Sequence, residues 1–569
     1  MAGLYSSVHA LPFIPDNLTV AQFMLDSQHE IQPTRQPDQP CLVDDQTCKA
    51  IGIEELRNMT RSLANVLSSR YQSKLSAKIP LDYPVALWAV HRLGGIVTCS
   101  NPQFKADELA YQISAANVGL VIVHSTLLET VISATYLTGL PVDRIIVLDP
   151  PPASYGHKIF DISTLLTLGE SQPFPHRERI LRSGEGRKKI ALLAWSSGTT
   201  GNPKAVAISH TALIANILQM ATHNQVDKDR WQHASHRRGF HPGDVTLAVL
   251  PFYHVAGLVL SLHFSLFCAM SVVIVQKYDF LGMLKSIQLH GVTHLIIVPP
   301  QGLTLCKHPA VKDYDLTGIK YILLGAAPVP QEIQEQLCHT FPQAQIGQAY
   351  GLTEMTATLS MLPVTQEQGM LGSAGRLLPG IQARVVKADG TAAGYGEPGE
   401  LVVRGESMAL GYFNDQKASR ETFKDGWLYT GDEVVISRSR DVFVFDRLKE
   451  MIKVNGYQVA PAELEGCLLA HPDVADCCVV GLPDDIRGEV PLAYVVLSSR
   501  ASKRITQNEG TLGAIIQGIT HHVASHKAQY KHLRGGVRIL DAIPRNGSGK
   551  LLRRVLRESA REPRISPKL

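Results

Sequence analysis

The chain has 569 residues, more than one hydrophobic core normally supports, so its length predicts at least two domains. Hydrophobic residues make up 45% and charged residues 19%, a balance that excludes long disordered segments. The net charge of +4 is small, and residues 545–569 hold most of the positive excess. Nine cysteines without a CxxC pair favour free thiols in a reducing compartment over a disulfide framework or a zinc site. The N-terminal residues lack the pattern of a secretory signal, which predicts an intracellular protein.

Short apolar runs alternate with amphipathic stretches through the first part of the chain. Runs of the strand type occupy residues 118–123, 144–148, 190–195, 294–299 and 321–325. This alternation is typical of an α/β fold in which helices cover a largely parallel sheet. Leu213, Ile217 and Met220 recur at helical spacing and predict a helix soon after the glycine-rich loop at residues 196–204. The loop is therefore expected between a strand and a helix.

Residues 255–275 contain no formally charged side chain, and 21 such residues are long enough to span a membrane. Gly257, Ser261 and His263 interrupt the stretch, which ends in the β-branched run VVIV. A buried helix that leads into a buried strand explains this pattern better than a transmembrane span.

The pattern changes near Leu401. Short runs punctuated by Gly and Asp predict strands at residues 400–405, 412–415, 425–432 and 442–447, and hence a β-rich subdomain. Farther along, residues 462–470 are expected to be helical, residues 474–482 and 491–497 to be strands, and the basic C-terminus to form a helix. We therefore predict a large N-terminal α/β domain over residues 1–445 and a small, mobile α+β domain over residues 446–569.

The strongest local motif is SSGTTGNPK at residues 196–204. Its two glycines, four hydroxyl side chains and one lysine can surround a polyphosphate with backbone N–H groups, hydroxyls and a positive charge. An ordinary polar turn is the alternative explanation. The motif is not a P-loop, because no G-K-[ST] follows, and GSGK at residues 547–550 fails the same test.

The loop resembles the signature of the adenylate-forming superfamily, which includes acyl-CoA synthetases, luciferases and peptide-synthetase adenylation domains. Further blocks follow in the family's order: GAAP (325–328), QAYGLTE (348–354), GWLYTGD (426–432), DRLKEMIKVNGYQVAPAELE (446–465) and PRNGSGKLLRR (544–554). The resemblance covers nearly the whole chain. It is strongest to the plant 4-coumarate:CoA ligase branch and its fungal relatives, through QVAPAELE and YPVALWAVHRLGGIVTCSNP.

This resemblance implies an acid-thiol ligase that uses ATP, Mg²⁺ and coenzyme A. A carboxylic acid and ATP give acyl-AMP and pyrophosphate, and CoA then takes the acyl group and releases AMP. Such chemistry needs positioning and cationic stabilisation more than a nucleophilic side chain. By resemblance, the residues that contact ATP and AMP are Ser196, Ser197, Gly198, Thr199, Thr200, Gly201, Lys204, Gln348, Ala349, Tyr350, Gly351, Thr353, Asp432, Arg447 and Lys550.

The family's catalytic lysine matches Lys550, and Thr353, Glu354 and His254 complete the implied catalytic set. Thr200 and Glu354 match the positions that hold the metal ion. The residues implied for the acyl group and acyl-AMP are His254, Leu323, Gly325, Ala326, Ala327, Lys449 and Lys453, and those implied for CoA are Lys277, Asn455, Gly456 and Gln458. Asp446 matches the hinge on which the small domain rotates between the two half-reactions.

Plainer structural explanations exist for six of these residues. Asp432 could be a turn residue after Gly431, and Lys550 could be a solvated charge on a glycine-serine loop. His254 lies beside apolar residues, where a hydrogen-bonded core histidine is common. Lys277 is equally explained as a surface lysine. Lys449 and Lys453 are spaced to share one helical face as plain surface charges.

Three positions depart from the family pattern. Leu323 stands where hydroxycinnamate ligases commonly carry a lysine suited to a phenolic oxygen, and an apolar wall disfavours burying a hydroxyl without a partner. We therefore expect an aliphatic or unsubstituted aryl acid rather than 4-coumarate. Ala205 replaces the glycine usual after PK, and activity should survive this change. Between Ser68 and Asp82 the chain is shorter than its relatives, so a strand is shortened or lost there.

The last three residues, Pro567, Lys568 and Leu569, resemble a peroxisomal targeting tripeptide and imply an import receptor as partner. A basic tail with an accidental match, in a cytoplasmic protein, is the alternative. We expect a role in β-oxidation or fungal secondary metabolism, no nucleic-acid partner and no transmembrane span. One rival is an adenylate-forming enzyme that does not use free CoA, of the luciferase or acyl-AMP ligase type. The other is a nucleic-acid-binding protein with a cationic stripe of Arg553, Arg554, Arg557, Arg561 and Arg564.

Overall fold

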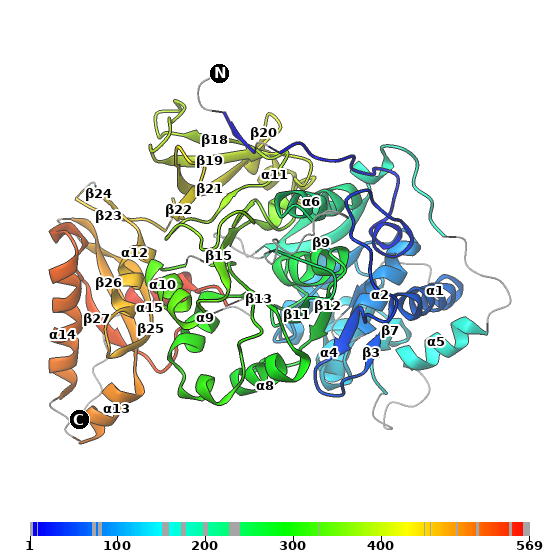
Figure 1. The fold of residues 1–569 in the computed structure, drawn as a ribbon, viewed down its shortest axis with the longest axis horizontal. Coiled ribbons are helices and arrows are strands. Elements are labelled where there is room, and N and C mark those ends of the chain that lie inside the picture. Colours follow the sequence, from blue (N-terminus) through cyan, green and yellow to red (C-terminus); the bar gives the residue numbers. More distant parts are fainter. Residues whose placement is uncertain are drawn as a thin grey trace.

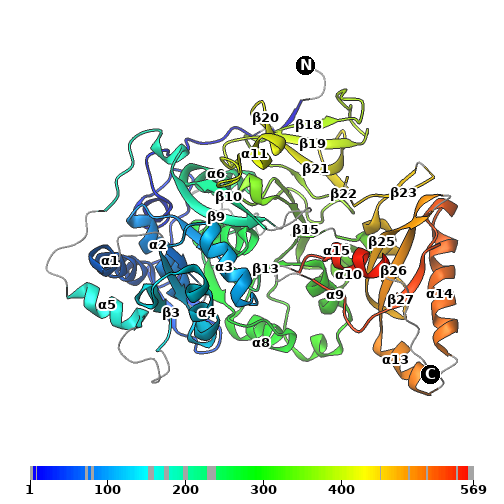
Figure 2. The ribbon, with the colours of Figure 1, turned by 180° about the vertical axis from the view of Figure 1, so that it is seen from behind.

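The computed structural model describes residues 4–7, 9–70, 75–77, 82–150, 159–171, 178–196, 203–226, 239–327, 329–448, 450–455, 457–484, 487–507, 511–545 and 549–561. Four sheets organise these residues, two of them large and largely parallel (Figures 1 and 2). Among the described residues, no helix combines the length and apolar character needed to cross a bilayer.

The first large sheet has the strand order β10-β9-β5-β4-β6-β7-β8. Its strands are β4 (Leu75–Ala77), β5 (Val97–Cys99), β6 (Leu120–Val123), β7 (Ile145–Val147), β8 (Phe160–Asp161), β9 (Ile190–Ser196) and β10 (Lys204–Ser209). The helices of this region are α1 (Ile53–Arg70), α2 (Asp82–Arg92), α3 (Ala106–Ala115), α4 (Leu128–Thr138) and α5 (Ile162–Glu170). The strands predicted at residues 118–123, 144–148 and 190–195 are confirmed as β6, β7 and β9.

The second large sheet has the order β17-β16-β15-β14-β13-β11-β12-β2-β3. Its strands are β2 (Leu42–Asp44), β3 (Ala50–Ile51), β11 (Val245–Ala248), β12 (Ser271–Ile274), β13 (His294–Ile297), β14 (Tyr321–Leu324), β15 (Gln345–Tyr350), β16 (Ser360–Met361) and β17 (Arg376–Leu377). Helices α8 (Phe280–His290), α9 (Pro299–Lys307) and α10 (Gln331–Thr340) connect its parallel strands. The strands predicted at residues 294–299 and 321–325 are confirmed as β13 and β14.

Helix α6 (His210–His223) lies in the main hydrophobic core, and 13 of its 14 residues are buried. The π-helix η7 (Ala256–Phe264) packs against it and continues through α7 (Ser265–Phe267) into the buried strand β12. The prediction for residues 255–275, a buried helix that leads into a buried strand, is confirmed. The helix predicted from Leu213, Ile217 and Met220 is confirmed as α6.

The position expected for the glycine-rich loop was wrong in one respect. The loop does not lead directly into a helix, because strand β10 comes between the loop and α6 and pairs antiparallel with β9. Lys204 lies opposite Ser196 in this register, so the two ends of the loop are held side by side. The prediction missed β10 because KAVAIS contains only two β-branched residues and two alanines, which are depleted in strands.

The third sheet forms the β-rich subdomain. Its strands are β1 (Tyr5–Ser6), β18 (Gln382–Val386), β19 (Gly399–Arg404), β20 (Phe423–Lys424), β21 (Trp427–Ile436) and β22 (Val442–Arg447), with α11 (Gln416–Thr422) beside them. Three predicted strands are confirmed as β19, β21 and β22. The strand predicted at residues 412–415 is wrong: these residues make one bridge, between Tyr412 and Val206, and Asp415 then caps α11.

The small C-terminal domain occupies one end of the long axis in Figure 1, in orange and red. Its sheet contains β23 (Ile452–Val454), β24 (Tyr457–Val459), β25 (Val474–Asp484), β26 (Gly488–Leu497) and β27 (Gly536–Ile539). The helices are α12 (Pro461–Leu469), α13 (Ser499–Gln507), α14 (Thr511–His526) and α15 (Arg553–Arg561). The helix and two strands predicted after residue 461 are confirmed, as is the basic helix near the C-terminus. The boundary at residue 446 stays a prediction.

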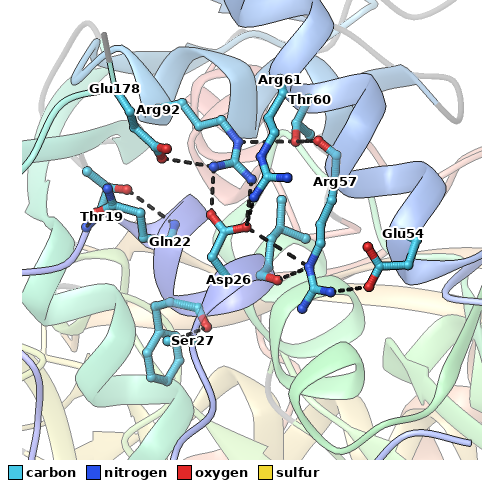
Figure 3. A network of polar contacts seen from close by, with 12 residues as sticks. Thr19, Gln22, Asp26, Ser27, Glu54, Arg57, Thr60, Arg61, Arg92 and Glu178 are labelled. Atoms are coloured by element: carbon cyan, nitrogen blue, oxygen red, sulfur yellow. Dashed lines mark hydrogen bonds and ion pairs between the residues drawn. The ribbon is translucent and has the colours of Figure 1, made fainter. Parts of the chain in front are cut away.

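Arg92 ties three segments of the large domain together (Figure 3). Its guanidinium is fully buried, lies 2.6 Å from Asp26 and 2.8 Å from Glu178, and donates to Thr60. Asp26 ends the π-helix η1 (Gln22–Asp26) and also pairs with Arg61 at 3.1 Å. A buried cation needs such partners, because removing them would leave its charge uncompensated.

The short segment between Ser68 and Asp82 contains a strand after all. Strand β4 has three residues and pairs in parallel with β5 and β6. The prediction that the strand could be lost is therefore wrong. The residues that flank β4 on both sides lie outside the described part of the chain.

Candidate functional site

A cavity of about 290 Å³ opens at the carboxyl ends of β13, β14 and β15. Parallel strands present their carboxyl ends at one edge of a sheet, where open α/β folds usually bind ligands. The residues that line it are Cys99, Asn101, Phe104, Gln112, Trp195, Ser196, Pro203, Leu250, Tyr253, His254, Val255, Ala256, Leu260, Ile296, Leu323, Leu324, Gly325, Ala326, Ala349, Tyr350, Gly351, Leu352, Thr353, Glu354, Ala357, Thr358, Arg447 and Lys550. Residues separated by more than 350 positions in the sequence thus share one cavity.

The glycine-rich loop leaves the first sheet at the wall of this cavity. Ser196 and Pro203 line the cavity, and the Lys204 ammonium lies 5.0 Å from the ring centroid of Tyr412. Ser197, Gly198, Thr199, Thr200 and Gly201 lie outside the described residues. The two described ends of the loop therefore lie beside the cavity. A cation–π contact with Tyr412 holds Lys204 at the second end.

Glu354 and Thr353 reach the cavity through a tight turn after β15. At Gly351 a Cβ atom would collide with the Ala357 carbonyl, so only glycine fits this close approach. The Tyr412 hydroxyl donates to Glu354 Oε1 at 2.8 Å, and the Ala409 N–H donates to the Glu354 carbonyl at 2.9 Å. One segment far along the chain, residues 409–412, thus holds both the carboxylate and the backbone of Glu354.

Asp432 lies beside the cavity, where it contacts two of the lining residues. The Tyr350 hydroxyl donates to Asp432 Oδ2 at 2.6 Å, and Arg447 Nε lies 3.4 Å from Asp432 Oδ1. Burial raises the pKa of Asp432, although Arg447 and the Tyr350 hydrogen bond oppose this shift. Burial alone would lower the pKa of Arg447, but the carboxylates of Asp432, Glu450 and Glu354 raise it. Arg447 therefore stays cationic at the wall.

Lys550 reaches the cavity from the small domain. Arg545 donates to the Gly549 carbonyl at 2.9 Å and to Asp476 at 2.8 Å, and Arg545 and Leu551 form a β-bridge. A Cβ atom at Gly549 would lie 3.2 Å from the Val298 side chain, so the loop abuts the end of β13. Burial, followed by the charge of Arg447, lowers the pKa of Lys550.

His254 lies on the cavity wall as a neutral ring. Its Nδ1 accepts a hydrogen bond from the Ala256 N–H at 3.2 Å, which places the ring proton on Nε2. Burial, and then the charge of Lys550, lowers the pKa of His254 to about 4. His254 can therefore donate one hydrogen bond near neutral pH and carries no positive charge there.

The far side of the cavity is apolar. Leu323 is 1% exposed and lies on β14 beside Ile296 of β13, and Leu250, Val255 and Leu260 add further aliphatic surface. Gly325 and Ala326 line the cavity where β14 ends, and a Cβ atom at Gly325 would lie 2.9 Å from the Ala349 carbonyl. Ala327 follows them but does not line the cavity.

Several predicted site residues lie elsewhere. Gln348 precedes Ala349 on β15, but its amide is buried and donates to Gln334 at 2.9 Å, so its side chain does not line the cavity. Lys277 is exposed after β12. Lys453, Asn455 and Gln458 are exposed on the β23–β24 hairpin, where Lys453 pairs with Gln458. The alternative prediction that Lys453 lies on the face of a helix is thus wrong. Lys449 and Gly456 are not among the described residues.

Asp446 connects the two domains through its side chain. The carboxylate is buried and accepts hydrogen bonds from the Arg447 N–H at 2.8 Å and from the Ala462 N–H, in the first turn of α12, at 3.4 Å. Burial raises the pKa of Asp446 to about 6, although the charge of Arg553 opposes the shift.

The cationic stripe predicted on α15 is interrupted, because two of its arginines are paired with carboxylates. Arg553 is 4% exposed and lies between Glu450, at 3.1 Å, and Glu465, whose Oε2 is 2.9 Å away. Arg554 pairs with Glu558 at 3.7 Å. Arg564 and the C-terminal residues Pro567, Lys568 and Leu569 fall outside the described range.

Some lining residues had no sequence signal that singled them out. Gln112 is buried, and its Oε1 has no hydrogen-bond partner within the described part of the chain. Trp195 donates to Thr98 at 2.9 Å and precedes the glycine-rich loop directly. Its place just before that loop is the one signal that would have identified it. Tyr412, the partner of Glu354, fell within the wrongly predicted strand.

Comparisons with known proteins agree with this geometry. A family model described as AMP-binding enzyme matches residues 29–413, and one described as AMP-binding enzyme C-terminal domain matches residues 463–550. 4-Coumarate--CoA ligase 3 of Arabidopsis thaliana is 32% identical over 96% of this chain and 92% of its own length. The 4-coumarate--CoA ligase of Pinus taeda is 33% identical over 91% and 92%, respectively.

Solved structures confirm the expected fold. The anthranilate CoA ligase AuaEII, in complex with anthranoyl-AMP, has a TM-score of 0.80 at 21% identity and covers 96% of this chain and 98% of its own. ATP-bound MatB from Rhodopseudomonas palustris has a TM-score of 0.78 at 24% identity, with 95% and 99% covered. At these identities the likeness is one of fold: a large N-terminal domain and a small C-terminal domain.

Proposed function

The chain belongs to the AMP-binding enzyme family, and we propose that it is an ATP-dependent acid-thiol ligase that forms an acyl-adenylate and then an acyl-CoA. The observation that carries this proposal is the convergence of Lys550, Arg447, Glu354 and His254 on one cavity with an apolar far wall. The curated relatives named 4-coumarate--CoA ligase support the same reaction class.

In the first half-reaction, a carboxylate oxygen of the acid attacks the α-phosphorus of ATP. The new acyl O–P bond forms as the bond from that phosphorus to the bridging oxygen breaks, and pyrophosphate leaves. Negative charge accumulates around the α-phosphate, so cations fixed at this point stabilise the transition state. Lys550 and Arg447 supply such charges, and Lys204 with the loop residues Ser196, Ser197, Gly198, Thr199, Thr200 and Gly201 would hold the β- and γ-phosphates.

The nucleoside would lie against the turn after β15. Asp432 would accept hydrogen bonds from the ribose hydroxyls, with Arg447 and Tyr350 holding its carboxylate in place. Ala349, Tyr350, Gly351 and Thr353 form the adjacent wall. Since the Gln348 amide bonds Gln334, its contribution would come from the strand backbone and not from its side chain.

Mg²⁺ would accompany ATP, and Glu354 offers the kind of hard carboxylate oxygen that this ion prefers. Thr200 is the second proposed donor. Bound there, the ion would neutralise phosphate charge. The Tyr412 hydrogen bond to Oε1 fixes the Glu354 carboxylate for that purpose.

In the second half-reaction, the sulfur of CoA attacks the acyl carbonyl carbon, the thiol proton leaves to solvent, and AMP departs. We propose that rotation about Asp446 exchanges Lys550 for the β23–β24 hairpin at the same cavity. Lys453, Asn455 and Gln458 are exposed on that hairpin, ready to be presented, with Lys449 and Gly456 in the same segment. Lys277 would contact the anionic end of CoA.

The apolar wall of the cavity limits which carboxylic acid can bind. His254, Gly325, Ala326 and Ala327 would border the carboxylate end, and Leu323 would face the body of the substrate. The β14 side chains that line the cavity, Leu323 and Leu324, offer no partner to a phenolic oxygen, so we propose an aliphatic or unsubstituted aryl acid over 4-coumarate. The C-terminal PKL supports a peroxisomal location and an import receptor, within β-oxidation or fungal secondary metabolism.

Lys550→Ala tests the proposed reaction. We expect at least a hundredfold loss of ATP–pyrophosphate exchange, because Lys550 is a fixed cation at the reacting phosphate. Attack of CoA on chemically supplied acyl-AMP should change less than threefold. Lys503→Ala, an exposed lysine of α13, serves as the matched control. Equal loss of both half-reactions would contradict the assigned role.

A panel of acids, assayed with and without CoA, tests the substrate class and the rival function. We expect thioester formation with free CoA and faster exchange with cinnamate or medium-chain acids than with 4-coumarate. Adenylation without thioester formation would instead favour an enzyme of the luciferase or acyl-AMP ligase type.

A further inference from the structure

A second cavity, of about 340 Å³, lies between the N-terminal strand β1, the end of α6 and the β21–β22 turn. Its lining residues are Leu4, Tyr5, Ser6, Ser7, His9, His223, Gln225, Pro363, Val364, Thr365, Arg376, Leu377, Tyr395, Ile436, Arg438, Ser439 and Arg440. None of them lines the first cavity. The blue N-terminal trace crosses to β18 in Figure 1 and marks this side of the molecule.

Three arginines face this cavity, and their charges are poorly compensated. Arg376 Nε is buried and has no hydrogen-bond partner among the described residues, and Arg376 Nη2 lies 3.6 Å from Asp441 Oδ2. Asp441 is fully buried and also accepts from the Ser439 hydroxyl at 2.7 Å. Arg438 and Arg440 are exposed and form no ion pair with a described residue. Exposed guanidinium groups without an ion pair in the described part of the chain, such as those of Arg438 and Arg440, favour a ligand that supplies oxygen acceptors.

The charges around the cavity indicate how many negative charges its ligand carries. Three guanidinium groups against the single carboxylate of Asp441 leave an excess of two positive charges. Burial lowers the pKa of His223 to about 4, so this histidine adds no charge near neutral pH. Glu397, near Tyr5, is paired with Lys387 at 2.8 Å. A phosphate monoester carries between one and a half and two negative charges at pH 7 and accepts forked guanidinium hydrogen bonds.

The remaining walls are apolar or aromatic, which indicates an organic body beyond the anionic group. Tyr5 and Tyr395 form an edge-to-face pair with centroids 5.0 Å apart, and the Tyr5 hydroxyl is already bonded to the Ala393 carbonyl. Leu377 and Ile436 add aliphatic surface. We propose that this cavity is a second ligand site, separate from the acid and ATP site, which binds a compact organic phosphate monoester.

Calorimetric titration of the full-length protein with phenyl phosphate tests the proposal, with inorganic phosphate and benzoate as comparison probes. The wild-type protein should bind phenyl phosphate at least tenfold more tightly than either probe, because only phenyl phosphate combines a dianion with an apolar body. The Arg438→Gln/Arg440→Asn double variant should lose at least tenfold in phenyl phosphate affinity. Asn is chosen because Arg440 has φ +69°, a conformation that Asn adopts readily.

The matched control is Lys417→Gln/Arg420→Gln, which removes two exposed charges of α11 and leaves the cavity intact. This control should bind phenyl phosphate as the wild type does, and both double variants should keep wild-type ATP–pyrophosphate exchange. Unchanged binding in the Arg438→Gln/Arg440→Asn variant, an equal loss in the control, or benzoate binding as tightly as phenyl phosphate would each overturn the proposal. Because exchange activity is measured separately, failure of this site leaves the proposed reaction untouched.

Discussion

At position 323, one side chain determines what the far wall of the acid cavity can hold. Leu323 is buried, and its neighbours on β13 and β14 are aliphatic or aromatic. Leu323→Lys should raise the ratio of kcat/KM for 4-coumarate over cinnamate by about tenfold, because a hydrogen bond from a cation to a buried hydroxyl contributes roughly 1.5–3 kcal/mol. Initial rates with the two acids at matched ATP and CoA measure this ratio.

Leu323→Met is the control for that substitution. It conserves volume and apolar character, so the ratio should stay within twofold of the wild type. If the ratio for Leu323→Lys also stayed within twofold of the wild-type ratio, position 323 would not determine the choice between the two acids.

Most candidate site residues could be found from contiguous motifs, and the misses have a physical cause. Glu354, Asp432 and Lys550 each lie within a run of matching letters. Tyr412 does not, because its hydrogen bond to Glu354 depends on a single bridge between Tyr412 and Val206. For Gln348 the motif identifies the right segment but not the direction of the side chain. Its backbone lies at the site, but packing against α10 turns its side chain away.

At the scale of elements, continuous apolar runs predicted the buried parallel strands well, whereas the mixed run that forms β10 was missed. Strands β13 and β14 are continuous apolar runs because both faces of a parallel sheet are covered. Residues 412–415 have aromatic character, which favours strands, but Asp415 uses its side chain to cap α11. Capping and long-range bridges are decided by tertiary neighbours, which local patterns do not contain.

The junction between β22 and α12 carries the hinge prediction. The Asp446 carboxylate holds the first turn of α12 to the end of β22, so a change of its backbone angles would reorient the small domain. Asp446→Pro fixes φ and should lower thioester formation at least tenfold more than ATP–pyrophosphate exchange. Single-turnover assays of each half-reaction measure the two effects.

Asp446→Ala separates the backbone effect from loss of the carboxylate. It should reduce the two half-reactions to a similar extent, because it removes the hydrogen bond without fixing φ. If Asp446→Pro behaved in the same way as Asp446→Ala, rotation about this residue would be ruled out as the cause.

At the scale of the whole molecule, the position of the small domain could not be predicted from sequence patterns. Its core forms one apolar cluster with part of the second large sheet, and Lys307 of α9 donates to the Leu469 carbonyl of α12 at 3.3 Å. Figure 1 shows α9 and α10 beside the small domain. Alternating apolar residues predict that each face is buried, but not which partner covers it.

Buried histidines give the whole protein a dependence of stability on pH. Burial lowers the pKa of His91 to about 3 and the pKa values of His254 and His263 to about 4, so these rings stay neutral in the folded state. In the unfolded chain a histidine titrates near 6.5. The stabilisation is therefore complete above pH 6.5 and is lost as the pH falls toward 4, because the unfolded state binds more protons there.

His263→Gln isolates one of these groups. The Trp88 indole donates to His263 Nε2 at 3.2 Å, and Nδ1 lies 2.8 Å from the Leu258 carbonyl, so a glutamine amide can keep both an acceptor and a donor. Between pH 6.5 and 5 the variant should lose about 1.6 kcal/mol less free energy of unfolding than the wild type, because the unfolded-state histidine is half protonated at pH 6.5 and almost fully protonated at pH 5. Urea denaturation at the two pH values measures this difference. His521→Gln, at an exposed position of α14, should follow the wild type, and identical pH dependence in both variants would show that His263 is not the titrating group.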